Sequence, residues 1–276
     1  PNLTFIQHNV KHQYYIPNTP NLKLDFILHL AGIASPHWYK QLPLETMDVA
    51  VAGSYHMLEL AKEHDARYFF SSSSEVYQTA TVVPTPESYV GAIPSMTDRS
   101  CYDVSKLMGE TMAYVYSQKY GVDAVVVRYF NSFGCGMSEK DRRILTSIAS
   151  AMKGGREMTV YGRVDRLPRR TYTPVTNTVL GTLLVLLRGA SGEVYNVGLD
   201  SPEITVPELL ERIRHVTGKE IRYHVEPPPE HYASEPLRRC PDITKLKGLG
   251  FRPCVDLDMG LSRFFAWAME TYSGAT

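Results

Sequence analysis

Long apolar runs are missing from this sequence, since none approaches the roughly 18 residues that a membrane-spanning helix needs. We also expect no signal peptide at its start. An excess of one charge is missing as well, because 29 Lys and Arg residues balance 29 Asp and Glu residues. This balance argues against a nucleic-acid or membrane-surface partner. We therefore expect a soluble, cytoplasmic protein.

Cysteines are few, and internal repeats and low-complexity tracts are missing. The cysteines are scattered along the chain and lack the close spacing of metal ligands, so the sequence predicts no metal site and favours reduced thiols. They are Cys101, Cys135, Cys240 and Cys254. At 276 residues the chain is long enough to bury one large core or two small ones.

The first half of the chain alternates short strand-like runs with helical patterns. Such alternation predicts an α/β protein whose parallel sheet has helices on both faces. The apolar run from Ala124 to Val127 is typical of a strand buried on both sides. We expect strands at Leu3–Gln7, Asp25–Ala31, Arg67–Ser72 and Asp123–Phe130, and helices at Pro43–His64 and Arg99–Tyr120.

After about Gly134 the pattern loosens and predicts a smaller α+β lobe. Such a lobe usually closes over a ligand at the carboxyl edge of a parallel sheet. A loop is expected from Glu226 to Pro241. We expect helices at Arg142–Lys153, Thr176–Arg188, Val206–Gly218 and Leu257–Thr271, and strands at Met158–Tyr161, Val194–Gly198 and Ile221–Val225.

Tyr102 and Lys106 stand four residues apart, so on a helix they project from the same face one turn apart. An ammonium beside a phenol favours the phenolate and lowers a pKa that starts near ~10. Such a phenol can exchange a proton with a substrate hydroxyl. The serines from Ser71 to Ser74 close an apolar strand upstream and can hold that hydroxyl by hydrogen bonds. By itself the pair is a weak signal, because both residue types are common on helix surfaces.

Seven ordered segments place this pair in a wider context. Together they resemble the extended short-chain dehydrogenase/reductase family, in its nucleotide-sugar branch, and most closely the UDP-glucuronate decarboxylases (UDP-xylose synthases). The segments are His29–Pro36, Ser73–Tyr77, Arg99–Lys106, Arg128–Gly134, Thr159–Gly162, Arg170–Tyr172 and Arg239–Ile243. Seven landmarks at compatible spacings are far more specific than any one of them.

The resemblance implies a role for each matching residue. Tyr102 would be the catalytic base, Lys106 its partner, and Ser73 the hydroxyl that holds the sugar O4. Glu75 would be the acidic residue near C5, and Arg170 would lie near the glucuronate carboxylate. The substrate-binding residues would be Ser74, Asn131, Arg143, Tyr161 and Arg239. The cofactor-binding residues would be Leu30, Ala31 and Ser71, together with Tyr102 and Lys106.

The resemblance also implies a reaction and an assembly. With NAD as cofactor, a UDP-uronic acid would be oxidised at C4, lose CO2 as a β-keto acid, and be reduced again to UDP-xylose, or stop at the 4-keto intermediate. The fold would be a Rossmann-like domain over residues 1–134 and a nucleotide-sugar-binding lobe over residues 135–276, with some segments returning to the sheet. A homodimer would form through a four-helix contact of the two long helices, Pro43–His64 and Arg99–Tyr120.

Alternatives remain at the level of function and of single residues. A nucleotide-sugar 4,6-dehydratase or 4-epimerase shares most of the pattern, and a cofactor-free protein could bind the nucleotide sugar or act on it without redox chemistry. Glu75 also fits a solvated strand end, and Arg170 fits a surface cluster with Arg169. Arg238 competes with Arg239. Asp103 and Ser105 fit ordinary helix-surface positions.

The cofactor site departs from the family pattern. The sequence has no G-x-x-G-x-x-G turn, and Leu3–Gln7 aligns with the family's third strand, so the first strand, its helix and the second strand are not in this chain. That third strand would be unpaired or forced against the next one. Asn9, Ala50 and Gln78 stand where the family usually has Asp, Asn and Gly. Either the natural protein has a further N-terminal segment, or it has lost tight NAD binding.

Overall fold

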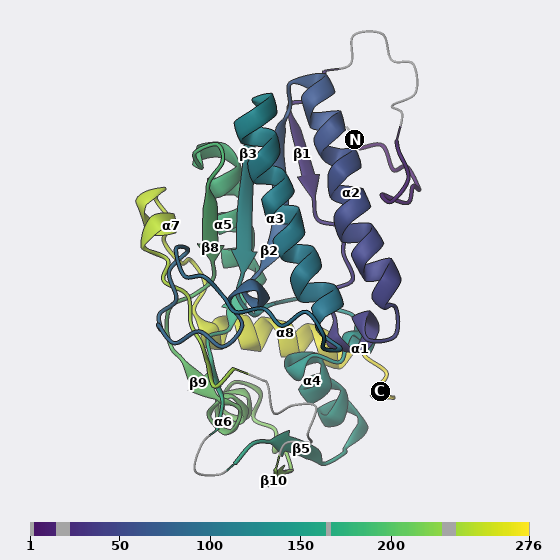
Figure 1. Ribbon diagram of the computed structural model, residues 1–276. Coiled ribbons are helices and arrows are strands. Elements are labelled where there is room, and N and C mark those ends of the chain that lie inside the picture. Colours follow the sequence, from purple (N-terminus) through teal and green to yellow (C-terminus); the bar gives the residue numbers. More distant parts are fainter. Residues whose placement is uncertain (1–2, 15–22, 164–166, 228–235, 276) are drawn as a thin grey trace.

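The computed structural model describes residues 3–14, 23–163, 167–227 and 236–275 (Figure 1). Its centre is a sheet of four strands in the order β1-β2-β3-β8. The strands are β1 (Phe26–His29), β2 (Arg67–Ser73), β3 (Ala124–Tyr129) and β8 (Val194–Val197). Every pair in this sheet is parallel. The predicted parallel α/β sheet is therefore confirmed.

Helices cover both faces of the sheet. The long helices α2 (Pro43–His64) and α3 (Ser100–Tyr120) lie side by side on one face (Figure 1). They bury Tyr68 and Phe70 of β2. On the other face, α5 (Val175–Arg188) covers Phe69 of the same strand and Val125 of β3. Alternate residues of each strand thus enter opposite cores, as the pleat of a strand requires.

The ends of the long helices follow local rules. A proline at position 43 starts α2, where the backbone N–H has no partner within the helix. Gly121 ends α3 in the left-handed conformation, with φ of 70°, which allows its N–H to bond back to the Tyr116 carbonyl. The predicted bounds of both helices agree with the structure to within one residue, because apolar periodicity and end signals coincide there.

The smaller lobe has its own core, in which Ile148, Leu209, Phe264 and Phe265 are fully buried. A parallel pair of β5 (Met158–Tyr161) and β10 (Tyr223–Glu226) flanks it. The lobe's helices are α4 (Ile144–Gly154), α6 (Val206–Thr217) and α8 (Leu257–Thr271). Since α5 and β8 also follow residue 134 and yet belong to the sheet layers, the division at that residue stays a prediction.

Short elements connect these layers and position the site. They are α1 (Pro36–Tyr39), η1 (Ser74–Tyr77), β4 (Ser132–Phe133), η2 (Glu139–Asp141), β6 (Arg169–Arg170), β7 (Thr173–Pro174), β9 (Ile204–Thr205), β11 (Arg238–Arg239) and α7 (Thr244–Gly248). The strand β6 pairs with β11 on one side and β9 on the other, and β4 pairs with β7. Most of the expected loop from Glu226 to Pro241 lies outside the described residues.

The expected strand at Leu3–Gln7 is wrong. This segment forms no strand, and Leu3 and Phe5 are each 86% exposed. A strand gains its stability from a neighbour that satisfies its backbone groups, and the segment pairs with none of the described residues. The outer edge of β1 is likewise unpaired within the described ranges, and its Phe26 and Leu28 are partly exposed.

Two smaller differences concern element ends. The helix expected from Arg142 begins only at Ile144, because Arg142 has a φ of 55° and so cannot be in a right-handed helix. The strand expected at Ile221–Val225 is shifted to Tyr223–Glu226, in register with β5. In the parts of the chain that the structure describes, we find no helix with the length and apolar character that crossing a bilayer requires.

Candidate functional site

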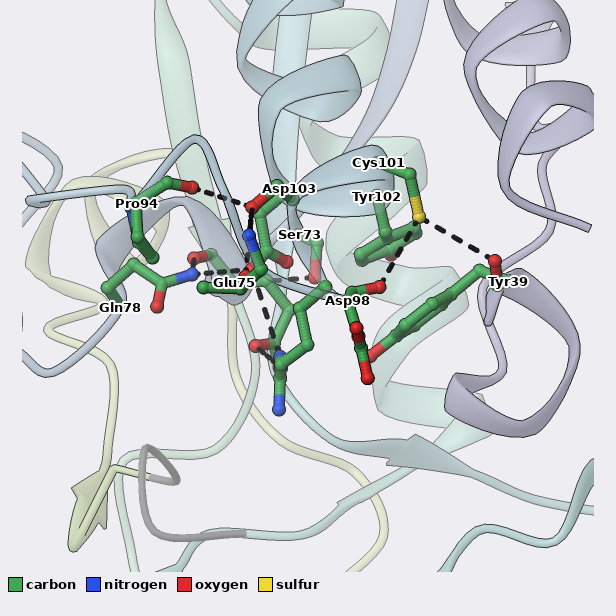
Figure 2. A network of polar contacts seen from close by, with 12 residues as sticks. Tyr39, Ser73, Glu75, Gln78, Pro94, Asp98, Cys101, Tyr102 and Asp103 are labelled. Atoms are coloured by element: carbon green, nitrogen blue, oxygen red, sulfur yellow. Dashed lines mark hydrogen bonds and ion pairs between the residues drawn. The ribbon is translucent and has the colours of Figure 1, made fainter. Parts of the chain in front are cut away.

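The candidate site lies where β2 ends and α3 begins. Ser73 is the last residue of β2, and Glu75 follows on the short helix η1. The Ser73 Oγ accepts a hydrogen bond of 3.3 Å from the Glu75 backbone N–H, so the serine caps η1. Tyr102 is in the first turn of α3 and only 6% exposed. The strand end and the helix start thus bring three predicted residues to one carboxyl edge of the sheet (Figure 2).

Tyr102 is a neutral, protonated phenol in this environment. Burial raises the pKa of Tyr102 to about 12, although its side-chain hydrogen bond with Ser73 acts in the opposite direction. Its ring stacks on Tyr39 of α1, with centroids 5.1 Å apart and an angle of 11° between the planes. The charge of Arg143 also acts to lower this pKa. Stacking therefore fixes the position of the phenol, and nearby positive charge lowers its pKa.

Lys106 does not have the predicted effect on Tyr102. Its Nζ donates a hydrogen bond of 2.7 Å to the Ser71 carbonyl and lies 5.8 Å from the centroid of the Tyr102 ring. Burial lowers the pKa of Lys106 to about 8. The expectation that this ammonium lowers the pKa of Tyr102 is wrong for this structure, because the ammonium bonds to the strand carbonyl and burial dominates at the phenol.

Glu75 is an ion-paired carboxylate and not a solvated strand end. It pairs with Arg99 of α3 and with Arg239 of β11, and its side chain is 18% exposed. Burial alone would raise the pKa of Glu75, but the positive charges of Arg239 and Arg99 outweigh it and hold the pKa below its ordinary value. Arg170 acts in the same direction. Glu75 is therefore ionised and surrounded by guanidinium groups.

The structure brings Arg170 and Arg239 together through strand pairing. The two residues face each other in the register of β6 and β11, and Arg239 is buried. Arg238, the competing position, instead pairs with Glu203 and is mostly exposed. Of the two adjacent residues Arg238 and Arg239, it is thus Arg239 that reaches the site.

The other predicted substrate residues are more widely placed. Arg143, before α4, pairs with Asp141 at 2.5 Å. The Asn131 amide donates to the Thr171 carbonyl at 3.0 Å, which fixes the turn after β3. Ser74 is buried in η1, and Tyr161 is exposed at the end of β5. The substrate roles of these four residues stay predictions.

A cavity of about 760 Å³ lies between the loop after β1 and the segment after β4. Its size suits a small-molecule ligand. Arg143 is the predicted substrate residue on its wall, together with Ser35 and Trp38. Ser35 Oγ donates to the Asp141 carbonyl at 2.6 Å, and Trp38 Nε1 donates to the Lys140 carbonyl at 3.2 Å. These two hydrogen bonds connect the opposite walls of the cavity. The next residue in the chain after Trp38 is Tyr39, which stacks on Tyr102.

The residues predicted to bind the cofactor meet at the carboxyl ends of β1 and β2. The Ser71 Oγ donates to the His29 carbonyl at 2.9 Å. Leu30 is 56% exposed, and Ala31 follows it. A Cβ added to Gly32 would lie 3.4 Å from the Lys106 Nζ, so the chain passes close to the buried ammonium there. This arrangement fits the nicotinamide-ribose end of a dinucleotide, whereas the sequence has no Gly-rich turn for its pyrophosphate.

Sequence reasoning missed several residues of this site. Asp103 and Ser105 were expected on the helix surface, but both are buried, and Asp103 is only 1% exposed. Asp103 Oδ2 accepts a hydrogen bond of 2.6 Å from Gln78 Nε2 (Figure 2). Burial, and then the charge of Glu75, raise the pKa of Asp103 to about 6. Arg99, which binds Glu75, stands one helical turn before Asp103, and that spacing was the available signal.

Comparisons with known proteins agree with this geometry. The sequence profile of the NAD dependent epimerase/dehydratase family matches residues 4–198. UDP-glucuronic acid decarboxylase 1 of Danio rerio is 35% identical over 263 residues, which are 95% of this chain and 60% of that protein. UDP-glucuronic acid decarboxylase 5 of Arabidopsis thaliana is 34% identical over 262 residues, which are 95% of this chain and 73% of that protein. The chain thus spans about 60% of the length of the first relative and about three quarters of the second.

Solved structures share the fold. UDP-glucose 4-epimerase from Thermotoga maritima, with UDP-glucose, has a TM-score of 0.78 at 26% identity, covering 90% of this chain and 78% of that chain. A variant of UDP-glucuronic acid 4-epimerase from Bacillus cereus, with NAD and a fluorinated UDP-glucuronic acid, has a TM-score of 0.76 at 23% identity, covering 90% of this chain and 76% of that one. At that identity the second match shows the fold alone. These matches confirm the expected Rossmann-like fold.

Proposed function

Because the chain belongs to the NAD dependent epimerase/dehydratase family, we propose that it is a lyase that decarboxylates a UDP-uronic acid, namely UDP-glucuronate. The names of the Danio rerio and Arabidopsis thaliana relatives support this substrate. The observation that supports the reaction most strongly is the charge around Glu75. Three arginines, Arg99, Arg170 and Arg239, act on this one carboxylate. Glu75 and the neighbouring Asp103 face these three guanidinium groups, and the remaining excess of positive charge suits a sugar that brings a further carboxylate into the site.

In the proposed mechanism Ser73 holds the C4 hydroxyl and Tyr102 accepts its proton. A nicotinamide cofactor, when bound, would accept the hydride from C4 and later return it. Tyr102 has a pKa of about 12 even though the charge of Arg143 acts to lower it, so this pKa has to fall further in the substrate complex before the phenol can act as a base. The same phenol returns the proton when the ketone is reduced.

Decarboxylation would use the arginine cluster. Arg170 would orient the C6 carboxylate, the C5–C6 bond would break, and its electron pair would form a C4=C5 double bond, which turns the C4 ketone into its enolate as CO2 leaves. C5 then requires a proton. Since Glu75 is ionised between Arg99 and Arg239, we propose that it orients a water molecule, which gives C5 its proton while the hydroxide left behind takes a proton from solvent. The protein would thus contribute position and charge to chemistry at C4 and C5.

Product analysis tests the proposal. The protein is incubated with NAD and either UDP-glucuronate or UDP-glucose, and the sugar nucleotides are identified by proton NMR. We expect UDP-xylose or its 4-keto precursor from UDP-glucuronate. Epimerised or dehydrated products, with no decarboxylation, would instead support a 4-epimerase or a 4,6-dehydratase.

The Arg170→Ala variant separates these reactions further. Removing this guanidinium should lower turnover of UDP-glucuronate on the order of 100-fold, while binding of UDP alone is retained. Arg169→Ala is the matched control, because Arg169 stands next to it on β6 and pairs with Glu208 at the surface. Equal turnover in both variants would contradict a role for Arg170 at the carboxylate.

A second candidate function is suggested by Asn9, Ala50 and Gln78, which stand at the cofactor site where the family pattern has Asp, Asn and Gly. A protein that holds the nucleotide sugar without NAD would bind UDP-glucuronate and leave it unchanged. Calorimetric titration with NAD in the presence of UDP distinguishes it from the decarboxylase. Retained UDP-sugar binding with no NAD binding would favour this second function.

We also propose a homodimer formed through α2 and α3. The outer faces of these helices expose several large apolar side chains, namely Met47, Tyr55, Val104, Leu107, Met108 and Val115. On α3 they recur at helical spacing and form one stripe. Light scattering should give the mass of a dimer, which Leu107→Lys should reduce to that of a monomer. Val179→Lys, on the exposed face of α5, is the control, and a monomeric wild-type protein would contradict the proposal.

A further inference from the structure

The backbone at Gln78 has a conformation that side chains rarely adopt. Gln78 ends η1 with φ of 51° and ψ of −134°. Glycine reaches this region easily, whereas a residue with a Cβ is strained there. Strain of this kind persists only where surrounding contacts hold the residue, and it is frequent at functional sites. The contacts of the Gln78 side chain therefore show what holds it.

The Gln78 amide joins the two elements that supply the proposed catalytic groups. Its Nε2 donates to the Asp103 Oδ2 at 2.6 Å and to the Glu75 carbonyl at 3.1 Å. The Gln78 backbone N–H also donates to the Glu75 carbonyl, at 3.0 Å. Glu75 is on η1, and Asp103 follows Tyr102 on α3. One amide group thus spans the gap between the elements of Glu75 and Tyr102 (Figure 2).

Arg99 completes a closed ring of contacts. It forms an ion pair with the Glu75 carboxylate, and its Nε lies 3.8 Å from the Asp103 Oδ2. The ring runs from the Glu75 carboxylate through Arg99, Asp103 and Gln78 back to the Glu75 carbonyl. Glu75 is on η1 and Gln78 directly follows that helix, while Asp103 is on α3 and Arg99 directly precedes it.

We propose that Gln78 and Asp103 are positioning residues that fix the Glu75 carboxylate relative to the Tyr102 phenol. This inference rests on the proposed function, because it assigns the ring a purpose in the same site. Asp103 is nearly fully buried close to the Glu75 carboxylate, which is energetically costly. The Gln78 amide and the Arg99 guanidinium offset this cost. Replacing Gln78 by glycine would suit the backbone better and remove one of the donors. The reason for a glutamine at position 78 therefore lies in the contacts of its side-chain amide, since its backbone conformation would favour glycine.

The test compares Gln78→Gly with Gln78→Met, which removes the amide but leaves a side chain of similar length. Gln78→Gly should unfold at a temperature close to that of the wild type, because glycine relieves the backbone strain while the buried Asp103 loses a donor. Both variants should lower kcat on the order of 10-fold to 100-fold at nearly unchanged KM, because the reacting groups lose alignment. In a double-mutant cycle with Asp103→Ala, the effects on kcat should be strongly non-additive.

A second measurement needs no turnover. With 13C-labelled glutamate carboxyls and tyrosine ring carbons, NMR reports the Glu75 and Tyr102 resonances directly, assigned by Glu75→Gln and Tyr102→Phe. Gln78→Gly and Gln78→Met should both shift or broaden these two resonances. If the wild type proves inactive but the resonances respond, the proposed function fails and the positioning role stands. Unchanged resonances in both variants, or an unchanged kcat in an active enzyme, would overturn the positioning role.

Discussion

The guanidinium of Arg239 forms an ion pair with the carboxylate of Glu75, 164 positions earlier in the chain. It connects β11 of the smaller lobe to the short helix at the carboxyl end of the central sheet. The two side chains are 7% and 18% exposed, so water and salt screen the pair only weakly. The pair therefore connects β11 to the charged groups around Glu75.

Replacing Arg239 with glutamine should destabilise the protein by about 1–3 kcal/mol, because a mostly buried carboxylate loses one of its two cationic partners. Since the folded pKa of Glu75 is lowered, this stability is complete above the unfolded pKa and is lost as the pH falls through the folded one. The loss should thus be larger near about pH 7 than near about pH 4 in urea titrations.

Arg238→Gln is the matched control for that experiment. Arg238 is the adjacent residue, but it is mostly exposed and pairs with Glu203 at the surface. We expect its replacement to change stability by less than about 1 kcal/mol at either pH. Equal effects of the two substitutions would show that Arg239 does not form a stabilising buried pair.

Tyr102→Phe should abolish turnover and leave the fold intact. The substitution removes the phenolic proton that the C4 hydroxyl has to exchange with, while the ring that stacks on Tyr39 is retained. Circular dichroism and UDP binding should match the wild type. Tyr114→Phe, on the exposed side of the same helix, should keep full activity. Comparable activity of Tyr102→Phe would remove this residue from the mechanism.

Lys106→Met should stabilise the protein. Burial lowers the pKa of Lys106 from 10.5 to about 8, so below this range the folded state has to hold a charged ammonium away from water. Between these pH values the unfolded state binds more protons, and stability therefore rises with pH in the wild type. The variant should lack this rise when unfolding is measured across the same range. A variant that is less stable than the wild type at every pH would contradict this account.

For a protein made of these 276 residues alone, NAD should bind hardly more tightly than nicotinamide mononucleotide. The described residues fit the nicotinamide-ribose end near Lys106 and Tyr102, and the sequence has no Gly-rich turn for the pyrophosphate. Calorimetry should therefore give dissociation constants for the two ligands within about 10-fold of each other. NAD binding that is tighter by several orders of magnitude would contradict the prediction and show that other residues of this chain bind the pyrophosphate.

The elements that sequence patterns predicted well are those set by local signals. The helix at Pro43–His64 and the strand β3 follow from apolar periodicity, a proline at the helix start and a continuous apolar run. Leu3–Gln7 also contains several apolar residues, but no strand pairs with it among the residues that the structure describes. A strand requires a partner, so its pattern alone was not sufficient.

The site was predictable where its residues belong to the two segments Ser73–Tyr77 and Arg99–Lys106. Ser73, Glu75 and Tyr102 come together as their segments indicated. Asp103 and Gln78 did not follow from the sequence, because their burial depends on how η1 packs against α3. The pKa of Tyr102 was predicted in the wrong direction, because helical spacing puts Lys106 one turn away but does not fix where its ammonium points.

The central claim is that this site removes CO2 from a UDP-uronic acid. The most direct test supplies UDP-glucuronate labelled with 14C at C6, together with NAD, and measures the labelled CO2 that is released. Wild-type protein should release the label with turnover, and Tyr102→Phe should release none. Binding of UDP-glucuronate and NAD without any release of label by the wild type would contradict the account.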